Sequence, residues 1–464
     1  MRTFLLLLLT LAPAACAAPP NVVLFLIDDL GWADLGCQGS DYYRTPNIDQ
    51  LAAGGVRFTD AYAACAVCSP TRASVLTGKY PARLMLTQWL PAGRWSPTDH
   101  RKREGRFLRA LPLEEITLAE ALRESGYQTF HVGKWHLGSA PFSLPAQHGF
   151  DVNIGGDEHG APGHYFFPYR GKWTVPTTGE PVHKQTLADG ADGEYLTDRL
   201  TDEAIGLVRE HADQPFFLHF AHYAVHTPLQ AKAEMVKKYA AVAKSGRQGK
   251  PAYAAMIESV DESVGRIVST LDELGLGDNT LIIFTSDNGG FAGATSNAPL
   301  RANKGAHYEG GIRVPLIVRG PGVSRAGTTC EIPAITNDLY PTILSLAGLP
   351  SRPAQHLDGV SLSPLLKGGA GAEPRSLFWH YPHYNRHPHS APASIIRKGA
   401  WKLIEFLEDG RTELFNLEHD IGETNNLIGE QAVRAAEMRA ELDAWRQQVG
   451  ADPMRPNPEF RPAP

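Results

Sequence analysis

The chain has 464 residues, a formal net charge of −6 and 43% hydrophobic residues, which is enough apolar material for one large α/β domain and a smaller second one. The mild acidity gives no indication of nucleic-acid binding, although a local cationic pocket can still hold an anionic substrate. Five cysteines in a chain of this length exclude a disulfide-dense scaffold.

Residues 1–18 are typical of a secretory signal peptide. Arg2 supplies the basic start, residues 4–11 are apolar, and small residues follow at 15–18. The apolar run is too short to span a membrane, so we expect a secreted or periplasmic protein without a transmembrane segment. A lipoprotein attached through Cys16 is the lesser alternative, because Pro13 is unfavourable three residues before that cysteine.

Removal of this leader leaves Cys37, Cys65, Cys68 and Cys330. If Cys68 is modified, at most one disulfide can form among the other three, and the sequence does not say which pair it joins.

Apolar strand-like runs alternate with helical segments through the first 350 residues. The run Asn21–Ile27 predicts a buried parallel strand, and further strands are expected at 127–132, 215–220, 280–285 and 312–318. Helices are expected from Pro46, from the capping box at Thr117, and at 197–211, 256–274 and 335–346. This alternation predicts a large, mostly parallel sheet between helices.

Two later regions differ in composition. Residues 139–195 are rich in Gly, Pro and aromatic residues without clear periodicity, which is typical of a functional insertion or lid. After a Gly-rich stretch at 367–374, short strands are expected at 393–396, 401–406 and 412–417, followed by a helix at 431–449 and a Pro-rich tail. We therefore expect a catalytic domain over residues 19–370 and a C-terminal α+β subdomain, with an antiparallel sheet and a helix, over residues 371–464.

The stretch Cys68-Ser69-Pro70-Thr71-Arg72 predicts the start of a helix. Ser69 is the expected N-cap, Pro70 the first helical residue and Gly78 the C-terminal stop. Free N–H groups at the helix N-terminus and the Arg72 guanidinium would surround Cys68 with positive potential. Alone, this pattern indicates either a cysteine nucleophile of lowered pKa or a buried structural cysteine.

Polar side chains follow four of the expected strands: Asp28 and Asp29, Lys134 and His136, His226, and Asp287 and Asn288. Sites in parallel sheets form at the carboxyl ends of the strands, so we expect these side chains to lie together. Three carboxylates and an amide are hard oxygen donors, which suit Ca²⁺ or Mg²⁺ better than zinc.

The stretch from Cys68 to Gly78 resembles the signature of the type I, formylglycine-dependent sulfatases. The similarity extends over residues 21–427 and includes the blocks Asp28-Asp29, Gly133-Lys134-Trp135-His136-Leu137-Gly138, His226-Thr227-Pro228, Asp287-Asn288-Gly289, and Lys304-Gly305 with Tyr308-Glu309-Gly310-Gly311. The resemblance implies an alkaline-phosphatase-like α/β fold and hydrolysis of sulfate esters. It also implies that a formylglycine-generating enzyme oxidises Cys68 to formylglycine, whose hydrate is the nucleophile.

The resemblance implies a set of site residues. The catalytic set is Cys68, Arg72, Lys134, His136, His226 and Lys304. The metal set, for Ca²⁺ with Mg²⁺ as the alternative, is Asp28, Asp29, Cys68, Asp287 and Asn288. Asp287 is the expected base for attack on sulfur, His226 with Lys304 acts on the leaving alcohol, and His136 removes the proton that releases sulfate from a covalent intermediate.

Substrate contacts are expected from His159 and from the His-rich run at 378–389, in which we choose His383 and Arg386. Such a run can bind metal, but its aromatic and Arg content favours the rim of a pocket. The expected substrate is a sulfated sugar, with aryl sulfates as artificial substrates. The alternatives are a phosphoesterase or phosphonate monoester hydrolase of the same superfamily, a non-catalytic carbohydrate-binding relative, and a thiol enzyme that uses unmodified Cys68.

Overall fold

The computed structural model describes residues 18–90, 98–171, 187, 190–246, 248–369 and 374–461. The predicted signal peptide therefore lies outside the described residues, except for Ala18. Within these residues every helix is too short or too polar to cross a bilayer. Cys37, Cys65, Cys68 and Cys330 are described, and none of them forms a disulfide with another.

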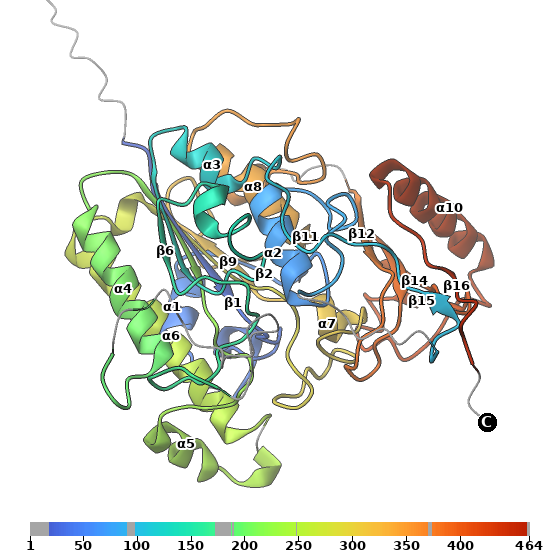
Figure 1. The fold of residues 1–464 in the computed structure, drawn as a ribbon, viewed down its shortest axis with the longest axis horizontal. Coiled ribbons are helices and arrows are strands. Elements are labelled where there is room, and N and C mark those ends of the chain that lie inside the picture. The colour runs from blue at the N-terminus through green and yellow to red at the C-terminus, as the bar shows by residue number, and fades with distance from the viewer. Residues whose placement is uncertain are drawn as a thin grey trace, which may run out of the picture.

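An eight-stranded sheet forms the centre of the molecule (Figure 1), in the order β10-β2-β9-β8-β1-β7-β5-β6. Only β9 runs antiparallel to its neighbours, so the predicted mostly parallel sheet is confirmed. The strands are β1 (Asn21–Ile27), β2 (Val56–Phe58), β5 (Gln128–Gly133), β6 (Val152–Ile154), β7 (Phe216–Ala221), β8 (Thr280–Ser286), β9 (Leu316–Arg319) and β10 (Thr328–Cys330).

Helices cover both faces of this sheet (Figure 1), because successive side chains of the buried strands point to opposite sides. In β1, Val23, Phe25 and Ile27 belong to one core, whereas Val22 and Leu24 belong to the other. The first core packs under α1 (Pro46–Ala53), α4 (Leu196–Glu210), α5 (Ala233–Ala240) and α6 (Pro251–Glu273). The second packs under α2 (Cys68–Thr77), α3 (Leu118–Arg123), α8 (Leu339–Leu346) and α9 (Ser363–Leu366).

A second, four-stranded antiparallel sheet follows, as expected for the C-terminal region. It is formed by β12 (Ser376–Tyr381), β13 (Ala393–Lys398), β14 (Trp401–Phe406) and β15 (Thr412–Asn416), and α10 (Ala432–Val449) packs on it. Its core includes Trp379 and Trp445 and also Tyr62 and Tyr80 of the larger region, so the two regions share packing. The predicted boundary at 370/371 lies within residues 370–373, outside the described residues.

Two short pairings complete the sheets: β3 (Ala61–Tyr62) with β11 (Ala334–Ile335), and β4 (Lys102–Arg103) with β16 (Arg455–Pro456). The second pairing joins residues 455–456, which follow α10, to a segment between α2 and α3.

Local predictions are mostly confirmed, but the short strands β2, β6 and β10 were not predicted and other elements need correction. Thr117 forms the expected capping box, and Pro46 begins α1. The N-cap of α2 is Val67 rather than Ser69, because the Ser69 hydroxyl instead accepts the N–H of Leu90 at 3.1 Å. The strand expected at 312–318 is shorter, since Ile312 ends α7 (Glu309–Ile312), and β12 was missed inside the His-rich run.

Candidate active site

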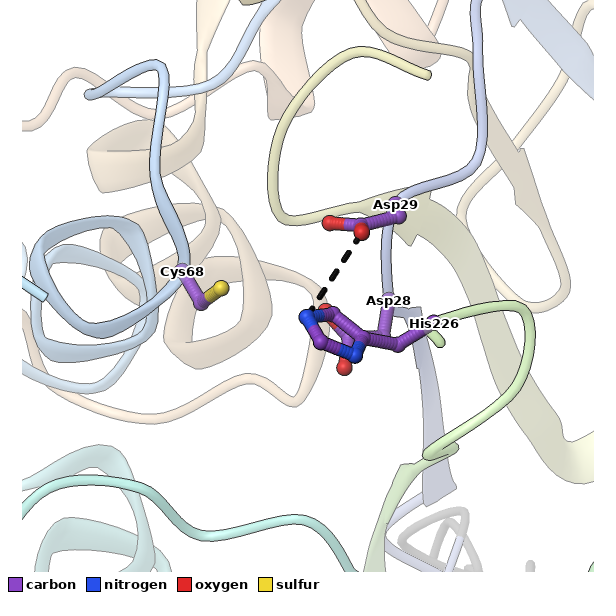
Figure 2. A group of neighbouring side chains, drawn as sticks. All are labelled: Asp28, Asp29, Cys68 and His226. Carbon is purple, nitrogen blue, oxygen red and sulfur yellow. Dashed lines mark ion pairs between the residues drawn. The ribbon is translucent and has the colours of Figure 1, made fainter. Parts of the chain in front are cut away.

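The predicted polar residues converge at the carboxyl ends of the central strands. Asp28 and Asp29 follow β1, Asp287 and Asn288 follow β8, and Lys134 follows β5. The N-terminus of α2 brings Cys68 to the same place, and Figure 2 shows its thiol pointing toward His226 and the two aspartates. The parallel register of β7, β1 and β8 explains this convergence, because it aligns the strand ends along one edge.

Oxygen atoms suited to a metal ion lie at the centre of this cluster. Ligand atoms of Asp28, Asp29, Cys68 and His226 all lie within 4.8 Å of one another. Buried Asp28 Oδ1 and Asn288 Oδ1 have no hydrogen-bond partner within the described part of the chain. Unpartnered buried oxygens among carboxylates are the donors that a hard divalent cation requires, so the residues present fit such an ion. The geometry adds His226, which was predicted only as a catalytic residue, to the candidate ligands.

Each buried carboxylate is paired with a buried cation. Lys134 Nζ lies 2.7 Å from Asp28 Oδ2, and Lys304 Nζ lies 2.6 Å from Asp29 Oδ1. Arg72 Nη2 lies 2.7 Å from Asp287 Oδ2, and its Nη1 donates to the Lys134 carbonyl at 2.9 Å. The predicted cations therefore reach the site, and the cluster formally balances three positive and three negative charges.

The two histidines that were predicted to be catalytic, His136 and His226, both have lowered pKa values, so their rings are neutral. Burial lowers the pKa of His226 to about 3, with the charge of Lys304 acting in the same direction, and burial also lowers the pKa of His136 well below its ordinary value. A carbonyl can only accept, so the proton of His136 lies on Nε2, which is 2.5 Å from the Leu90 oxygen. His136 Nδ1 is left buried and without a partner among the described residues, which suits the predicted removal of a proton.

For His226 the same reasoning gives the opposite ring atom. Nδ1 lies 2.8 Å from the Thr227 carbonyl and holds the proton, which leaves Nε2 as an acceptor 3.7 Å from Asp29 Oδ2. In this resting arrangement Nε2 has no proton to donate. Lys304 is the charged donor on this side of the cluster. Although burial alone would lower the pKa of Lys304, the charge of Asp29 raises this pKa above its ordinary range.

Burial sets the direction of the pKa shift for Asp28 and Cys68, whereas the charges of Lys304 and His226 outweigh burial and lower the pKa of Asp29. Burial raises the pKa of Asp28 to about 8, opposed by Lys134 and reinforced by Asp287. Burial also raises the pKa of the Cys68 thiol, although Lys134 and Lys304 act against it. The predicted lowered pKa of an unmodified Cys68 is therefore wrong, because the desolvation of a thiolate outweighs the helix N-terminus and the two lysines.

The three predicted substrate contacts lie in different surroundings. His159 is partly exposed and pairs with Asp157, whose carbonyl accepts the N–H of His136, so it lies next to the catalytic residues. Arg386 is exposed. His383 is fully buried, with Nε2 2.8 Å from Thr87 Oγ1, so a contact between its ring and substrate stays a prediction.

One residue of the same run was missed. His387 packs against Gly305, where an added Cβ would lie 2.5 Å from the His387 Cβ. Burial, and to a lesser extent the charge of Lys304, lowers the pKa of His387 to about 4. The His-rich composition pointed to the right segment, but which of its histidines faces the site depends on the turn after β12.

The fold and this cluster define a hydrolase of the alkaline-phosphatase-like class. Residues 20–349 match the family model described as sulfatase, and residues 302–448 match the one described as N-sulphoglucosamine sulphohydrolase, C-terminal. The chain therefore belongs to the sulfatase family.

Individual relatives agree with this assignment. A sulfatase of Formosa agariphila is 32% identical over 92% of this chain and 88% of its own, and human arylsulfatase A is 33% identical over 95% and 91%. Among solved structures, that of Ps i-CgsB in complex with k-i-k-neocarrahexaose is 33% identical, covers 92% of each chain and has a TM-score of 0.76. The phosphonate monoester hydrolase of Agrobacterium radiobacter, at 24% identity and a TM-score of 0.67, shares the fold.

Proposed function

We infer that this protein is a sulfatase, a sulfuric ester hydrolase that acts on sulfated carbohydrates. The observation that carries this conclusion is the buried cluster around Cys68, in which Lys304, His226 and Asp29 lie together, in a chain that belongs to the sulfatase family. The relative solved with a carrageenan oligosaccharide supports the substrate class. The alternative phosphonate monoester hydrolase is less favoured, because that likeness concerns the fold alone.

We further propose that Cys68 is converted to formylglycine by a formylglycine-generating enzyme and that Ca²⁺, or Mg²⁺, is the resident ion. Asp28, Asp29, Asp287 and Asn288 would hold the ion, with His226 at its edge. The ion would supply positive charge where negative charge develops on the sulfate ester, and the hydrated aldehyde would supply the nucleophile.

The protein side chains of the site have different roles in this reaction. Lys134, Lys304 and Arg72 hold the sulfate oxygens through fixed charges in a pocket from which water is largely excluded. Lys304 Nζ donates to the oxygen of the departing alcohol. His136 Nδ1, which has no other partner among the described residues, accepts the proton whose loss releases sulfate.

We also propose export from the cytoplasm, to the periplasm or the medium, from the composition of residues 1–18, and a division at 370/371 into a catalytic domain and a C-terminal subdomain. Packing of the second sheet on Tyr62 and Tyr80 supports a subdomain that folds against the first region rather than a freely jointed module.

The test compares 4-nitrophenyl sulfate with 4-nitrophenyl phosphate on protein from the native host, with mass spectrometry of the Cys68 peptide. We expect faster hydrolysis of the sulfate and an aldehyde or its hydrate at Cys68. A higher kcat/KM for the phosphate would overturn the sulfatase assignment. Sulfate hydrolysis by a sample with an intact thiol would overturn the formylglycine mechanism and keep the activity.

A further inference from the structure

A second pocket lies beside the active site and has no role in the reaction described above. It has a volume of about 320 Å³, and His100, Tyr384, Asn385, Arg386, Ser390 and Glu408 contribute to its wall. These residues come from the segment before β4, the β12–β13 connection and the β14–β15 turn. The volume is within the range of about 300–1,000 Å³ that is typical of small-molecule sites.

The pocket shares a wall with the active site. Asn385, which lines the pocket, donates from Nδ2 to the Gly305 carbonyl at 3.2 Å, and Gly305 directly follows Lys304. Two residues later, His387 packs on Gly305. The segment 384–387 therefore separates the two spaces, so a molecule whose sulfate ester lies at Lys304 needs little length to reach the pocket.

The wall combines a flat aromatic surface with a free cation. The His100 ring stacks on the Tyr384 ring, with centroids 3.6 Å apart and planes 9° from parallel. The Arg386 guanidinium is exposed and has no ion-pair or hydrogen-bond partner among the residues that the structure describes. Arg presents a planar set of donors that matches a sulfate or a carboxylate.

The remaining polar groups suit hydroxyl groups. Glu408 offers a carboxylate, and Asn385 offers its amide oxygen, because its Nδ2 group already donates to the Gly305 carbonyl and the Tyr381 hydroxyl. The Ser390 Oγ atom is buried in the wall and has no hydrogen-bond partner in the described part of the chain. Buried hydroxyls without partners are uncommon, and a bound polar molecule can supply what is missing after a small side-chain movement.

We propose that this pocket binds a second sugar residue of a sulfated oligosaccharide, with Arg386 paired to an anionic group on that residue. The inference rests on the proposed function and makes it narrower: the preferred substrate is an oligosaccharide that carries a negative charge on the residue next to the one that is desulfated. The His100–Tyr384 pair contacts the sugar ring, while Asn385 and Glu408 bind its hydroxyl groups.

The test measures binding separately from catalysis. Isothermal titration calorimetry on the inactive Cys68→Ala protein, loaded with Ca²⁺, compares tetrasaccharides from chondroitin sulfate, heparin and carrageenan with the sulfated monosaccharide of each. We expect at least one tetrasaccharide to bind at least about tenfold more tightly than its monosaccharide. Arg386→Ala should remove most of this gain, and Arg386→Lys should keep part of it because the charge remains.

Arg266→Ala is the matched control. This arginine is also exposed, but it lies on α6 and pairs with Asp202, so the gain should persist in this variant. Equal binding of every tetrasaccharide and its monosaccharide, or a gain that survives Arg386→Ala, would overturn the proposal.

Aryl sulfate hydrolysis by the unmutated enzyme distinguishes the two levels of inference. If the enzyme hydrolyses the aryl sulfate but binds no tetrasaccharide more tightly than its monosaccharide, the proposed second-sugar site is wrong and the sulfatase assignment stands. A tetrasaccharide gain in a protein that hydrolyses no sulfate ester overturns the proposed function and leaves a binding site for anionic oligosaccharides.

Discussion

Two buried clusters of charged residues have similar compositions, but in only one of them does every carboxylate oxygen have a close partner within the described part of the protein. The site cluster consists of Asp28, Asp29, Asp287, Arg72, Lys134 and Lys304. The interface cluster, between the large region and the second sheet, consists of Asp60, Glu309, Glu423, Arg313, Arg397 and Lys402. Each contains three carboxylates and three cations, so formal charge does not distinguish them.

The interface cluster is closed upon itself. Lys402 Nζ lies 2.9 Å from Glu309 and 2.8 Å from Glu423, and the Tyr62 hydroxyl donates to Glu309 at 2.7 Å. The charges of Lys402 and Arg313 outweigh burial and lower the pKa of Glu309. Such a network, complete without any ligand, joins α7 to β14.

The site cluster is unfinished. Asp28 Oδ1 and Asn288 Oδ1 are buried, and within the described residues neither of them accepts a hydrogen bond. Because its own charges already balance, a divalent cation and a sulfate ester that enter together change the total charge little. The difference teaches that buried charge marks a functional site where the hydrogen bonding is incomplete, and a structural joint where it is complete.

Replacing the nucleophile should have the largest effect. We expect Cys68→Ala to lower kcat/KM for an aryl sulfate by about 10⁴-fold or more, since nucleophile removal in other hydrolases has effects of this order. The melting temperature should change little. Initial rates check this, with Cys65→Ala as the control, because Cys65 is also buried, three residues earlier. Comparable losses in both variants would contradict a unique role for Cys68.

Breaking the interface cluster should mainly reduce stability. Lys402→Met leaves Glu309 and Glu423 buried without their shared cation, and we expect the free energy of unfolding to fall by about 3–5 kcal/mol. Urea unfolding monitored by fluorescence measures this. A loss below about 1 kcal/mol would mean that the closed network contributes no more than an exposed pair.

Metal binding should complete the site cluster. After treatment with EGTA, Ca²⁺ at about 100 times its Kd should raise the free energy of unfolding by about 2.7 kcal/mol, because the ion binds only the folded state. Thermal unfolding of the apo and loaded protein measures the shift, with Mg²⁺ in parallel. Asp28→Asn should reduce it, and an equal shift in that variant would place the ion elsewhere.

The smallest effect is expected for a solvated ion pair of the same sheet. Lys398 Nζ lies 2.8 Å from Glu441, but its side chain is 61% exposed. We expect Lys398→Met to lower the free energy of unfolding by less than about 1 kcal/mol, as measured by the same urea titration. A loss as large as that of Lys402→Met would show that burial is not what separates the two lysines.

The sequence predicted the site better than its surroundings. Asp28, Asp29, Asp287 and Asn288 follow strongly apolar strands, and the ends of parallel strands must meet, so pattern alone brought them together. The fold class followed from the same alternation of strands and helices.

What the sequence did not predict depends on tertiary contacts. The burial of His383 and the approach of His387 to Gly305 are set by how the second sheet packs, which no local pattern encodes. The interface cluster was missed for the same reason, since Glu309 and Lys402 are 93 residues apart. The predicted N-cap of α2 was wrong because the Ser69 hydroxyl accepts a hydrogen bond from the N–H of Leu90, 21 residues away.

All ten residues of α2 are buried, and Cys68 itself is only 4% exposed. An oxidising enzyme needs direct access to the thiol, which the folded chain does not offer. If Cys68 is converted to formylglycine as proposed, conversion has to be finished before this helix is packed, so folding and modification compete in time. Rapid production in a foreign host would then leave a fixed fraction of inert molecules that later incubation with the enzyme does not rescue.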